Sequence, residues 1–336
     1  MKKNHIKTMK IWNLYSNETP NFIDECCRAK AMKRLDGIGM NCGCEYTNFP
    51  IFSTLEKYSR YDHSRGVALI VWHFTQDPKQ VLAALFHDIA SPVFAHVIDF
   101  LNGDYLQQES TESGTEEMIA ESPEIQHCLH RLGITTDEVS DYHRYPIADN
   151  DTPRLSADRL EYTLGNIVNY KLADIETVET LYNALRVGQN EENQPEIMFR
   201  DADKALMFAE LALRCSNLYT SDADRYAMQC LAEILKACLD KGIIHENDFH
   251  STENEVIEKI RQSDFGRNEW QHFRQMNTMK LGSDSPKSRV IFAKKRHIDP
   301  YVAGCGRVSA LFPDFKAALR DYLDKDFAYP IYAAAE

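Results

Sequence analysis

The amino-acid sequence predicts an all-α fold, and two observations support this prediction. Apolar residues recur at intervals of three and four along most of the 336-residue chain, which is the spacing of one helix face. Many of these stretches begin behind Ser, Thr or Asp, the residue types that cap helix N-termini. Segments in which apolar and polar residues alternate are scarce, so little β-structure is expected.

The clearest expected helix begins at Pro78. In the segment DPKQVLAALFHDIA, residues 77–90, Asp77 suits the N-cap position and Pro78 suits the first helical position. Apolar residues follow at helical spacing, which predicts a buried helix that continues through His87 and Asp88. The same reasoning predicts helices at residues 63–75, 115–133, 156–170, 175–187, 200–219, 221–242, 252–262 and 314–326.

The remaining segments suggest how the chain is organised. Residues 288–302 are the best candidate for a short pair of strands or an extended segment. The polar stretch VGQNEENQPEI, residues 187–197, is the only convincing break. We therefore expect a helical core with an N-terminal extension at residues 1–190. A mainly helical region with a short strand-like basic segment is expected at residues 191–336.

The composition is that of a soluble globular protein, with 43% apolar and 26% charged residues. A formal net charge of −13 argues against a protein that coats duplex nucleic acid. No run of about 18 apolar residues and no secretory leader pattern is present, so no membrane partner is expected. Nine cysteines without regular spacing favour free thiols and a cytoplasmic location. The weaker alternative is a zinc site at Cys26, Cys27, Cys42 and Cys44, which lack a C-x₂-C pair.

The doublet His87–Asp88 is the strongest indication of chemistry. Burying two polar side chains within an apolar segment costs several kcal/mol unless another group pairs with both of them. A divalent metal ion does so, because imidazole supplies a lone pair and the carboxylate supplies charge. Further ligands are available from His63 in SRYDHSRG and from Asp158 in DRLEYTLGN.

The order H…HD…D resembles the HD-domain superfamily of metal-dependent phosphohydrolases. Residues 29–170 are most similar to the branch that contains deoxynucleoside triphosphate triphosphohydrolases, because Arg60 lies three residues before His63, the doublet is followed by Pro-x-Phe-x-His, and Tyr162 lies four residues after Asp158. The resemblance implies an HD-domain helical core and one divalent ion, whether Mn, Mg, Ni, Co, Fe or Zn. The ligands would be His63, His87, Asp88 and Asp158.

The resemblance also implies roles for residues around the metal. Arg60 would contact substrate phosphate, His96 would hold or protonate the phosphate chain, and Tyr162 would face the sugar. Helix geometry supports this arrangement, because Arg60 and His63 are spaced i, i+3, and Asp158, Tyr162 and Asn166 follow one another at i, i+4. Asn166 is therefore expected to bind substrate beside Tyr162.

The sequence departs from this branch at positions that would move protons. Ser91 stands where the branch has a histidine, Gln108 stands in place of a second histidine, and Asn166 replaces an aspartate. Glu109 is the candidate base, with Glu112 as a further possibility; the alternative is that both are solvated loop carboxylates.

Basic residues gather near the C-terminal end of this acidic chain. Residues 280–307 contain seven Lys and Arg residues and two Asp residues. One interpretation is a phosphate clamp that includes Lys295 and Arg296. The equally weighted alternative is a solvated edge guarded by lysines.

The expected function is hydrolysis of a nucleotide or a related small phosphate ester or anhydride. One alternative is a nucleotide sensor that retains the metal pocket and has lost the groups that transfer protons. Another is HD-type di-iron oxygenase chemistry, in which His127, His130 or His143 would extend the site to a second metal. A homo-oligomer is possible, as in relatives of this branch.

Overall fold

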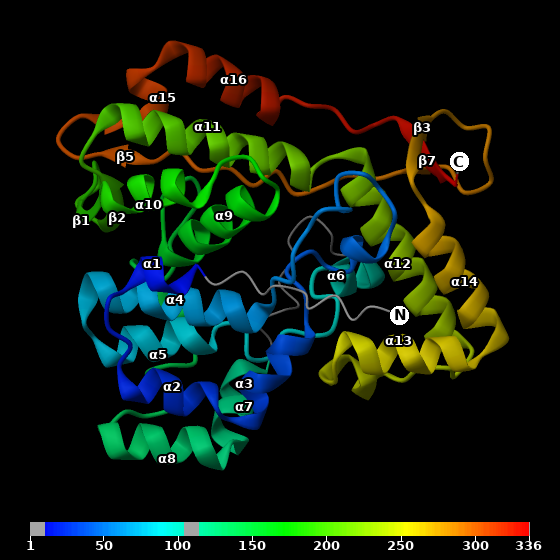
Figure 1. Cartoon of the computed structure of the whole chain (residues 1–336), viewed down its shortest axis with the longest axis horizontal. Helices are drawn as coiled ribbons and strands as arrows, with labels where there is room; N and C mark the ends of the chain where they lie inside the picture. The colour runs from blue at the N-terminus through cyan, green and yellow to red at the C-terminus, as the bar shows by residue number, and fades with distance from the viewer. Residues whose placement is uncertain (1–10, 104–113, 336) are drawn as a thin grey trace.

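The structure is a computed structural model that describes residues 11–103 and 114–335. It confirms a mainly helical fold with two small sheets. In Figure 1, α1 to α5 with α7 and α8 lie on the left, α12 to α14 lie on the right, and α11 and α16 lie along the top. No helix among the described residues has both the length and the apolar character needed to cross a membrane.

The described residues before Leu185 form helices that are joined by turns and loops. The longer of these helices are α4, α5, α8, α9 and α10, and shorter turns of helix connect them. The bounds are α1 (Trp12–Tyr15), α2 (Asn21–Cys27), α3 (Lys30–Arg34), η1 (Leu35–Gly37), η2 (Cys44–Tyr46), α4 (Arg60–Thr75), α5 (Pro78–Phe86), α6 (Val97–Asn102), α7 (Thr115–Glu121), α8 (Pro123–Leu132), η3 (Tyr142–Arg144), α9 (Ala157–Asn169) and α10 (Ile175–Asn183).

Helix α5 begins as expected but ends earlier. The Asp77 side chain accepts a hydrogen bond from the backbone N–H of Lys79, and Pro78 is the first helical residue. The helix ends at Phe86, and the chain then turns through hydrogen bonds from Ile89 N to Phe86 O and from Ser91 N to Asp88 O. The doublet His87–Asp88 thus lies in a tight turn directly after the helix. This prediction missed the turn because apolar periodicity continues through it.

A proline divides the helix expected at residues 115–133. The Ser122 side chain caps a new helix by accepting from Ile125 N, and Pro123 is its first residue. Pro lacks a backbone N–H and cannot continue the preceding helix, so α7 and α8 are separate.

The polar stretch at residues 187–197 lies within a β-hairpin. Strand β1 (Leu185–Gln189) pairs antiparallel with β2 (Pro195–Phe199), so the helix expected at 175–187 ends at Asn183. Strand β2 also pairs in parallel with β5 (Tyr301–Val302), and β5 pairs antiparallel with β6 (Gly306–Arg307). The division of the chain at residue 190 remains a prediction.

The second half of the chain contains two long helices and a second sheet. Residues 288–302 contain two short strands, β4 and β5, which do not pair with each other but belong to different sheets, and residues 291–300 between them have no regular secondary structure. The remaining bounds are α11 (Ala202–Tyr219), α12 (Asp222–Asp240), η4 (Glu246–His250), α13 (Glu253–Gln262), α14 (Asp264–Gln275), β3 (Thr278–Leu281), β4 (Arg289–Val290), α15 (Val308–Leu311), α16 (Pro313–Leu323) and β7 (Pro330–Ala334), with sheet order β3-β7-β4.

Helix α14 was not expected from the sequence. Most of its residues are charged or polar, and the buried side chains at its apolar positions are only Trp270 and Phe273. These two rings stack with their centroids 5.4 Å apart against the second apolar cluster described next. The helix is strongly amphipathic, but charged and polar residues outnumber the apolar ones, so few apolar residues mark its buried face in the sequence.

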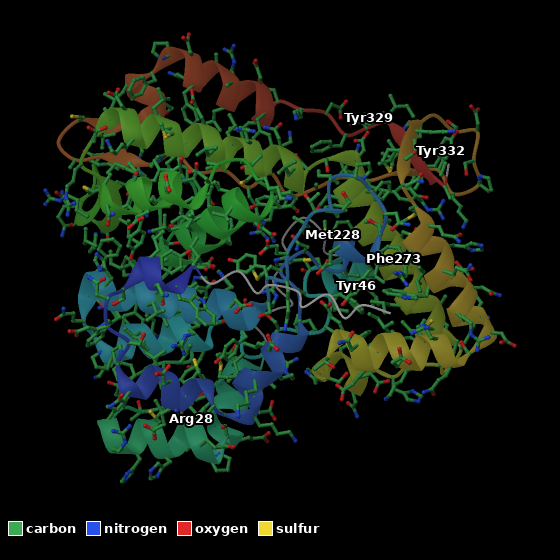
Figure 2. The ribbon with its side chains drawn as sticks, viewed as in Figure 1. Arg28, Tyr46, Met228, Phe273, Tyr329 and Tyr332 are labelled. Atoms are coloured by element: carbon green, nitrogen blue, oxygen red, sulfur yellow. The ribbon has the colours of Figure 1, made fainter. Side chains whose placement is uncertain are left out.

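Two buried apolar clusters position the site. The first contains the inner faces of α4, α5, α9 and α11, and the second contains α6, α12, α13 and α14. Figure 2 labels Tyr46, Met228 and Phe273, which belong to or pack on the second cluster. Each cluster draws residues from both halves of the chain, so the two halves fold around shared cores.

A buried arginine holds the start of residues 291–300, the segment that runs from the second apolar cluster to the first. Arg225 on α12 is fully buried, donates to the carbonyl of Ile291 and forms an ion pair with Asp222. Its guanidinium also lies over the rings of Phe327 and Tyr329, at 4.9 and 4.8 Å from their centroids. These contacts hold the start of residues 291–300 in place.

We expect Gly66→Ala to destabilise the protein by about 1–3 kcal/mol, because overpacking a fixed core is costly. Helices α4 and α9 meet at Gly66, where an added Cβ would lie 2.5 Å from Glu161 Oε1, and Glu161 is held by hydrogen bonds with His63 and Tyr58. At an exposed helical position, Gly→Ala would instead raise the free energy of unfolding by up to about 1 kcal/mol. The sign of the change therefore shows whether Gly66 is closely packed.

Urea unfolding followed by circular dichroism measures the change. His73→Ala, at an exposed position of the same helix, is the control and should shift stability by no more than about 0.5 kcal/mol. A Gly66→Ala protein as stable as the wild type would contradict the packing described for α4 and α9.

Candidate active site

Two histidine rings face each other between α4 and the turn after α5. His63 Nδ1 lies 2.6 Å from Glu161 Oε2, and His87 Nδ1 lies 2.7 Å from the carbonyl oxygen of Ala84. Because a carboxylate and a carbonyl only accept, each Nδ1 is the donor. The two Nε2 atoms, 3.2 Å apart, therefore point toward the same space.

Two carboxylates complete this cluster. Asp158 Oδ1 lies 2.9 Å from His63 Nε2 and 3.7 Å from His87 Nε2. Asp88 Oδ2 lies 3.5 Å from His87 Nε2 and is buried without a hydrogen-bond partner. The other oxygen of Asp88 accepts from Arg60 Nη1 and from Ser91 Oγ. All four residues expected to bind metal are thus brought together.

This arrangement fits a divalent cation. His63, His87 and Asp88 each offer a ligand atom within 4.8 Å of the others, and Asp158 adjoins both histidines. Burial alone would lower the pKa of His63, but hydrogen bonds with Asp158 and Glu161 raise it to about 10, so the cluster stabilises positive charge. The unpartnered buried oxygen of Asp88 is an acceptor that a metal ion would satisfy.

Sequence reasoning missed the carboxylate that orients His63. Glu161 is completely buried and accepts hydrogen bonds from Tyr58 and, at 3.4 Å, from Tyr15. Metal-binding histidines commonly donate their other ring nitrogen to such a carboxylate. The signal was present in the sequence, because Glu161 lies three residues after Asp158 on the same helix.

The cluster forms one wall of a cavity of about 460 Å³. The cavity is also lined by Arg60, His96, Tyr162, Asn166, Lys295 and Arg296, the described residues expected to contact substrate or to transfer protons. The remaining expected residue, Glu109, lies outside the described residues, as do Gln108 and Glu112. Other lining residues are Met40, Asn41, Cys42, Phe100, Tyr142, His143, Asp149, Thr152, Arg159, Tyr170, Tyr219, Asp224, Met228, Ala293, Lys294 and His297.

His96 is held as a neutral ring between a carboxylate and a guanidinium. Its Nδ1 lies 3.0 Å from Asp99 Oδ2, and its Nε2 lies 3.3 Å from Arg296 Nη2. Burial lowers the pKa of His96 to about 4, and the positive charges of Arg296 and Arg60 act in the same direction against the hydrogen bond to Asp99. At neutral pH, His96 therefore accepts from Arg296 and orients it.

The two basic residues expected to clamp phosphate are placed differently from each other. Arg296 contacts His96 at the cavity wall, whereas the ammonium of Lys295 donates to the carbonyls of Leu323 and Lys325 at the end of α16. Carbonyls at a helix C-terminus attract cations, which explains this position. Phosphate binding by Lys295 stays a prediction and requires its ammonium to leave these carbonyls.

Polar and aromatic groups of α9 and α11 line the inner part of the cavity. Asn166 Nδ2 donates to Tyr219 Oη over 2.7 Å, and Asn166 Oδ1 is buried without a partner. The ring of Tyr162 lies 6.4 Å from both His63 and Tyr219, measured between centroids. An acceptor and several rings are thus available to a bound molecule.

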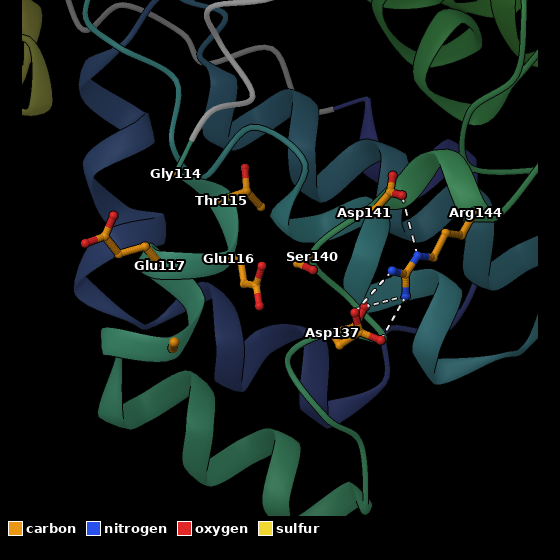
Figure 3. Close-up of a pocket in the computed structure, with 9 residues that line it drawn as sticks. Gly114, Thr115, Glu116, Glu117, Asp137, Ser140, Asp141 and Arg144 are labelled. Atoms are coloured by element: carbon orange, nitrogen blue, oxygen red, sulfur yellow. Dashed lines mark hydrogen bonds and ion pairs between the residues drawn. The ribbon is translucent and has the colours of Figure 1, made fainter.

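A second hollow lies on the surface between α7 and the segment before α9 (Figure 3). It is lined by Glu116, Glu117 and the ion-paired residues Asp137, Asp141 and Arg144. None of the residues expected to bind metal or substrate lines this hollow. The candidate active site is therefore the cavity beside the histidine pair.

We expect Asp224→Asn to make stability less dependent on pH. Asp224 lines the cavity, and burial raises its pKa to about 8, whereas an unfolded chain releases this proton near pH 4. The folded state therefore binds more protons between these values, and wild-type stability falls as pH rises from about 4 to about 8. Asn does not titrate. The free energy of unfolding of the variant minus that of the wild type should therefore be several kcal/mol larger at pH 8 than at pH 4.

Urea unfolding at both pH values measures this difference. Asp240→Asn, at the exposed end of the same helix, is the control for replacing an aspartate of α12 by asparagine. A pH-independent difference for Asp224→Asn would show that Asp224 is ionised in the folded protein.

Comparison of the sequence with known proteins finds distant relatives, and no known family model matches the chain. The chain is 26% identical over 246 residues to the uncharacterized protein YdhJ of Bacillus subtilis, which covers 72% of this chain and 71% of that protein. It is 23% identical over 202 residues to the metal-dependent phosphohydrolase cns2 of Cordyceps militaris. That match covers 59% of this chain and 53% of the relative.

Solved structures share the fold over nearly the whole chain. A phosphohydrolase from Bacteroides thetaiotaomicron superposes with a TM-score of 0.60 and 11% identity, covering 99% of this chain and 97% of that one. A hypothetical protein from Aquifex aeolicus superposes with a TM-score of 0.59 and 16% identity, covering 94% and 93%. The chain is thus similar in sequence to a metal-dependent phosphohydrolase and has the fold of a structure described as a phosphohydrolase.

Proposed function

We propose that the protein is an HD-type metal-dependent phosphohydrolase that acts on a nucleotide or a related small phosphate ester or anhydride. One observation carries this proposal: two imidazoles and two carboxylates converge on a cavity wall that also presents guanidinium groups. The similarity to a metal-dependent phosphohydrolase supports it.

The ion would be held by His63, His87, Asp88 and Asp158. When bound, it supplies Lewis acidity toward a phosphoryl oxygen and makes water more acidic. Glu161 and Ala84 fix the histidine tautomers, and Arg60 fixes Asp88 while itself lining the cavity. These contacts set the ligands before substrate arrives.

Guanidinium groups of the cavity suit a phosphate. Arg60, Arg159 and Arg296 line it, and each is oriented by a hydrogen bond, from Arg60 to Asp88, from Arg159 to Asn150 and from Arg296 to His96. The planar donor fork of Arg matches phosphate oxygens and keeps its charge at any working pH. Such groups would bind the substrate and stabilise charge on phosphorus oxygens.

The size and lining of the cavity support a nucleotide as substrate. About 460 Å³ lies within the range for small-molecule sites. Tyr162, Tyr170, Tyr219 and Phe100 offer faces for a base, and Asn166 Oδ1 offers an acceptor for a sugar hydroxyl.

The nucleotide sensor is the second candidate, and one contact favours it. Ser91 stands where a histidine was expected, and its hydroxyl donates to Asp88 Oδ1 over 2.7 Å. Ser91 thus supports a metal ligand and transfers no proton. Binding without turnover would agree with this role.

The di-iron alternative has less support. His127 and His130 are exposed on α8 and do not line the cavity, although His143 does. Within residues 11–103 and 114–335, only one group of three or more His, Cys, Asp or Glu side chains has ligand atoms close enough together to hold a metal ion. A single ion is therefore proposed, and cytoplasmic location and homo-oligomeric assembly remain predictions.

We expect the purified protein to bind a divalent ion and to release phosphate from a member of a nucleotide panel in Mn²⁺, Co²⁺, Ni²⁺ or Mg²⁺. Asp158→Asn should weaken metal binding and lower turnover at least tenfold, because it removes a ligand charge beside both histidines. Elemental analysis, titration calorimetry and a phosphate assay measure the two effects.

The matched control is His130→Gln, an exposed histidine on α8 that should behave as the wild type. Unchanged metal content in Asp158→Asn would contradict the ligand assignment. Tight nucleotide binding with no phosphate released would replace the enzyme by the sensor.

A further inference from the structure

We infer that Arg34 is a positioning residue for the turn that carries the metal ligands His87 and Asp88, and that the affinity of the site for a divalent ion depends on it. The inference rests on the proposed function, because it concerns how the proposed ligands are held. Arg34 does not line the cavity, so neither the ligand pattern in the sequence nor the cavity itself indicates this residue.

Arg34 is the last residue of α3, and its guanidinium reaches the turn that follows α5. Its Nη2 donates to the carbonyl oxygens of Ile89 and Ser91, over 2.9 and 2.8 Å. Its Nη1 donates to the carbonyl oxygen of Ser251, over 3.3 Å. Figure 1 shows α3 on the side of the left-hand helices that faces α13, which begins two residues after Ser251. One side chain thus joins backbone carbonyls from two distant parts of the chain.

The two carbonyl groups in the turn depend on Arg34 for their hydrogen bonds. Ile89 and Ser91 are fully buried, and their N–H groups donate to the carbonyl oxygens of Phe86 and Asp88. Among the residues that the structure describes, no other group donates to the carbonyl of Ile89 or Ser91. A buried carbonyl without a partner is costly, so loss of the guanidinium would leave two such groups or displace the turn.

The same contacts fix the carboxylate of Asp88. Ile89 follows Asp88 directly, and the Ser91 hydroxyl donates to Asp88 Oδ1 over 2.7 Å. Arg34 therefore holds both the residue next to this ligand and the residue whose hydroxyl orients it. Since Asp88 Oδ1 also accepts from Arg60, Asp88 Oδ2 is the oxygen left to face an ion.

The guanidinium of Arg34 is charged, which strengthens its hydrogen bonds to the turn. Burial lowers the pKa of Arg34 to about 10, while the charge of Asp88 opposes this shift, so Arg34 is positive at neutral pH. Hydrogen bonds from a charged donor are stronger than those between neutral groups. Arg34 forms no ion pair with a carboxylate of the described residues, so its charge acts on the backbone carbonyls.

The position of Arg34 is set by the junction of the two apolar clusters. Met32 and Leu35, on either side of Arg34, belong to the first cluster, whereas Phe249 belongs to the second. The N–H of Val93 donates to the carbonyl of Phe249 over 2.9 Å, which is a further link between the turn and the second cluster. Arg34 thus holds the ligand-bearing turn where the clusters meet.

Arg60 has a different role in the same place. Its Nη1 contacts the side chains of Asp88 and Ser91, and it lines the cavity. Arg34 contacts the backbone of the turn and does not line the cavity. Substitution of Arg34 therefore tests the support of the ligands without removing a group expected to contact substrate.

The test measures binding of Mn²⁺ and Co²⁺ to the full chain after its metal has been removed. We expect Arg34→Ala to raise the Kd for Mn²⁺, measured by calorimetry, about tenfold or more, as is typical when a residue that supports metal ligands is lost. The visible absorption spectrum of bound Co²⁺ should change as well, because it reports the arrangement of the ligands. Arg34→Lys should give an intermediate Kd, since Lys keeps the charge but lacks the planar donor fork.

The matched control is Lys33→Ala, at the neighbouring exposed position of α3, which should bind both ions as the wild type does. Urea unfolding of the metal-free proteins shows which variants are folded, and Arg34→Lys replaces Arg34→Ala in the comparison if the alanine variant is not. At saturating Mn²⁺, the KM for a nucleotide should be unchanged in the folded variants, because Arg34 does not line the cavity.

The outcomes distinguish this inference from the proposed function. A folded Arg34 variant that binds Mn²⁺ as tightly as the wild type would overturn the inference and leave the phosphohydrolase intact. A raised Kd with an unaltered Co²⁺ spectrum would count against it too, since the ligands would not have moved. A wild type that binds neither ion would overturn the metal site on which the proposed function depends.

Discussion

The Nε2 atoms of His63 and His87 face each other across 3.2 Å, with an Asp158 oxygen 2.9 Å from the first. Lone pairs at such distances repel unless positive charge lies between them. Glu161 and the Ala84 carbonyl hold the far sides of the rings, so neither histidine can turn away without leaving a buried group unpaired. The packing of α4, the turn after α5 and α9 is therefore coupled to the presence of a cation or a proton.

Features of the structure that depend on local sequence signals could be predicted from the sequence. Helix starts could be predicted because caps such as Asp77 and Ser156 are local signals. The four side chains that the sequence singled out as metal ligands do lie together, because their order and neighbours form a specific pattern. The end of α5, the strand β1 and the destination of the Lys295 ammonium could not be predicted. Strand β1 and the Lys295 ammonium depend on partners distant in sequence, namely Phe199 and the end of α16. Helix α5 ends in a turn that is held by local hydrogen bonds, but the apolar pattern continues through that turn and conceals it.

The buried carboxylates that hold histidine rings could be predicted only in part. Glu161 and Asp149 each hold a histidine, and a search for carboxylates able to reach the second ring nitrogen would have proposed Glu161 from its spacing to Asp158. Asp149 lies nine residues before Asp158, and nothing in the local pattern indicates that η3 folds back over it. Its role becomes visible only once the loop before α9 is seen in space.

The cavity is assembled from chain segments made at different times. His63, His87, Asp88 and Asp158 all precede the hairpin of β1 and β2, whereas residues 293–297 close the opposite wall and depend on the anchor at Arg225. The proposed metal ligands and residues 293–297 therefore come from separate parts of the chain. Because α4 and α9, which carry His63 and Asp158, share an apolar cluster with α11, the pocket is complete only after both halves of the chain have been synthesised and have packed together.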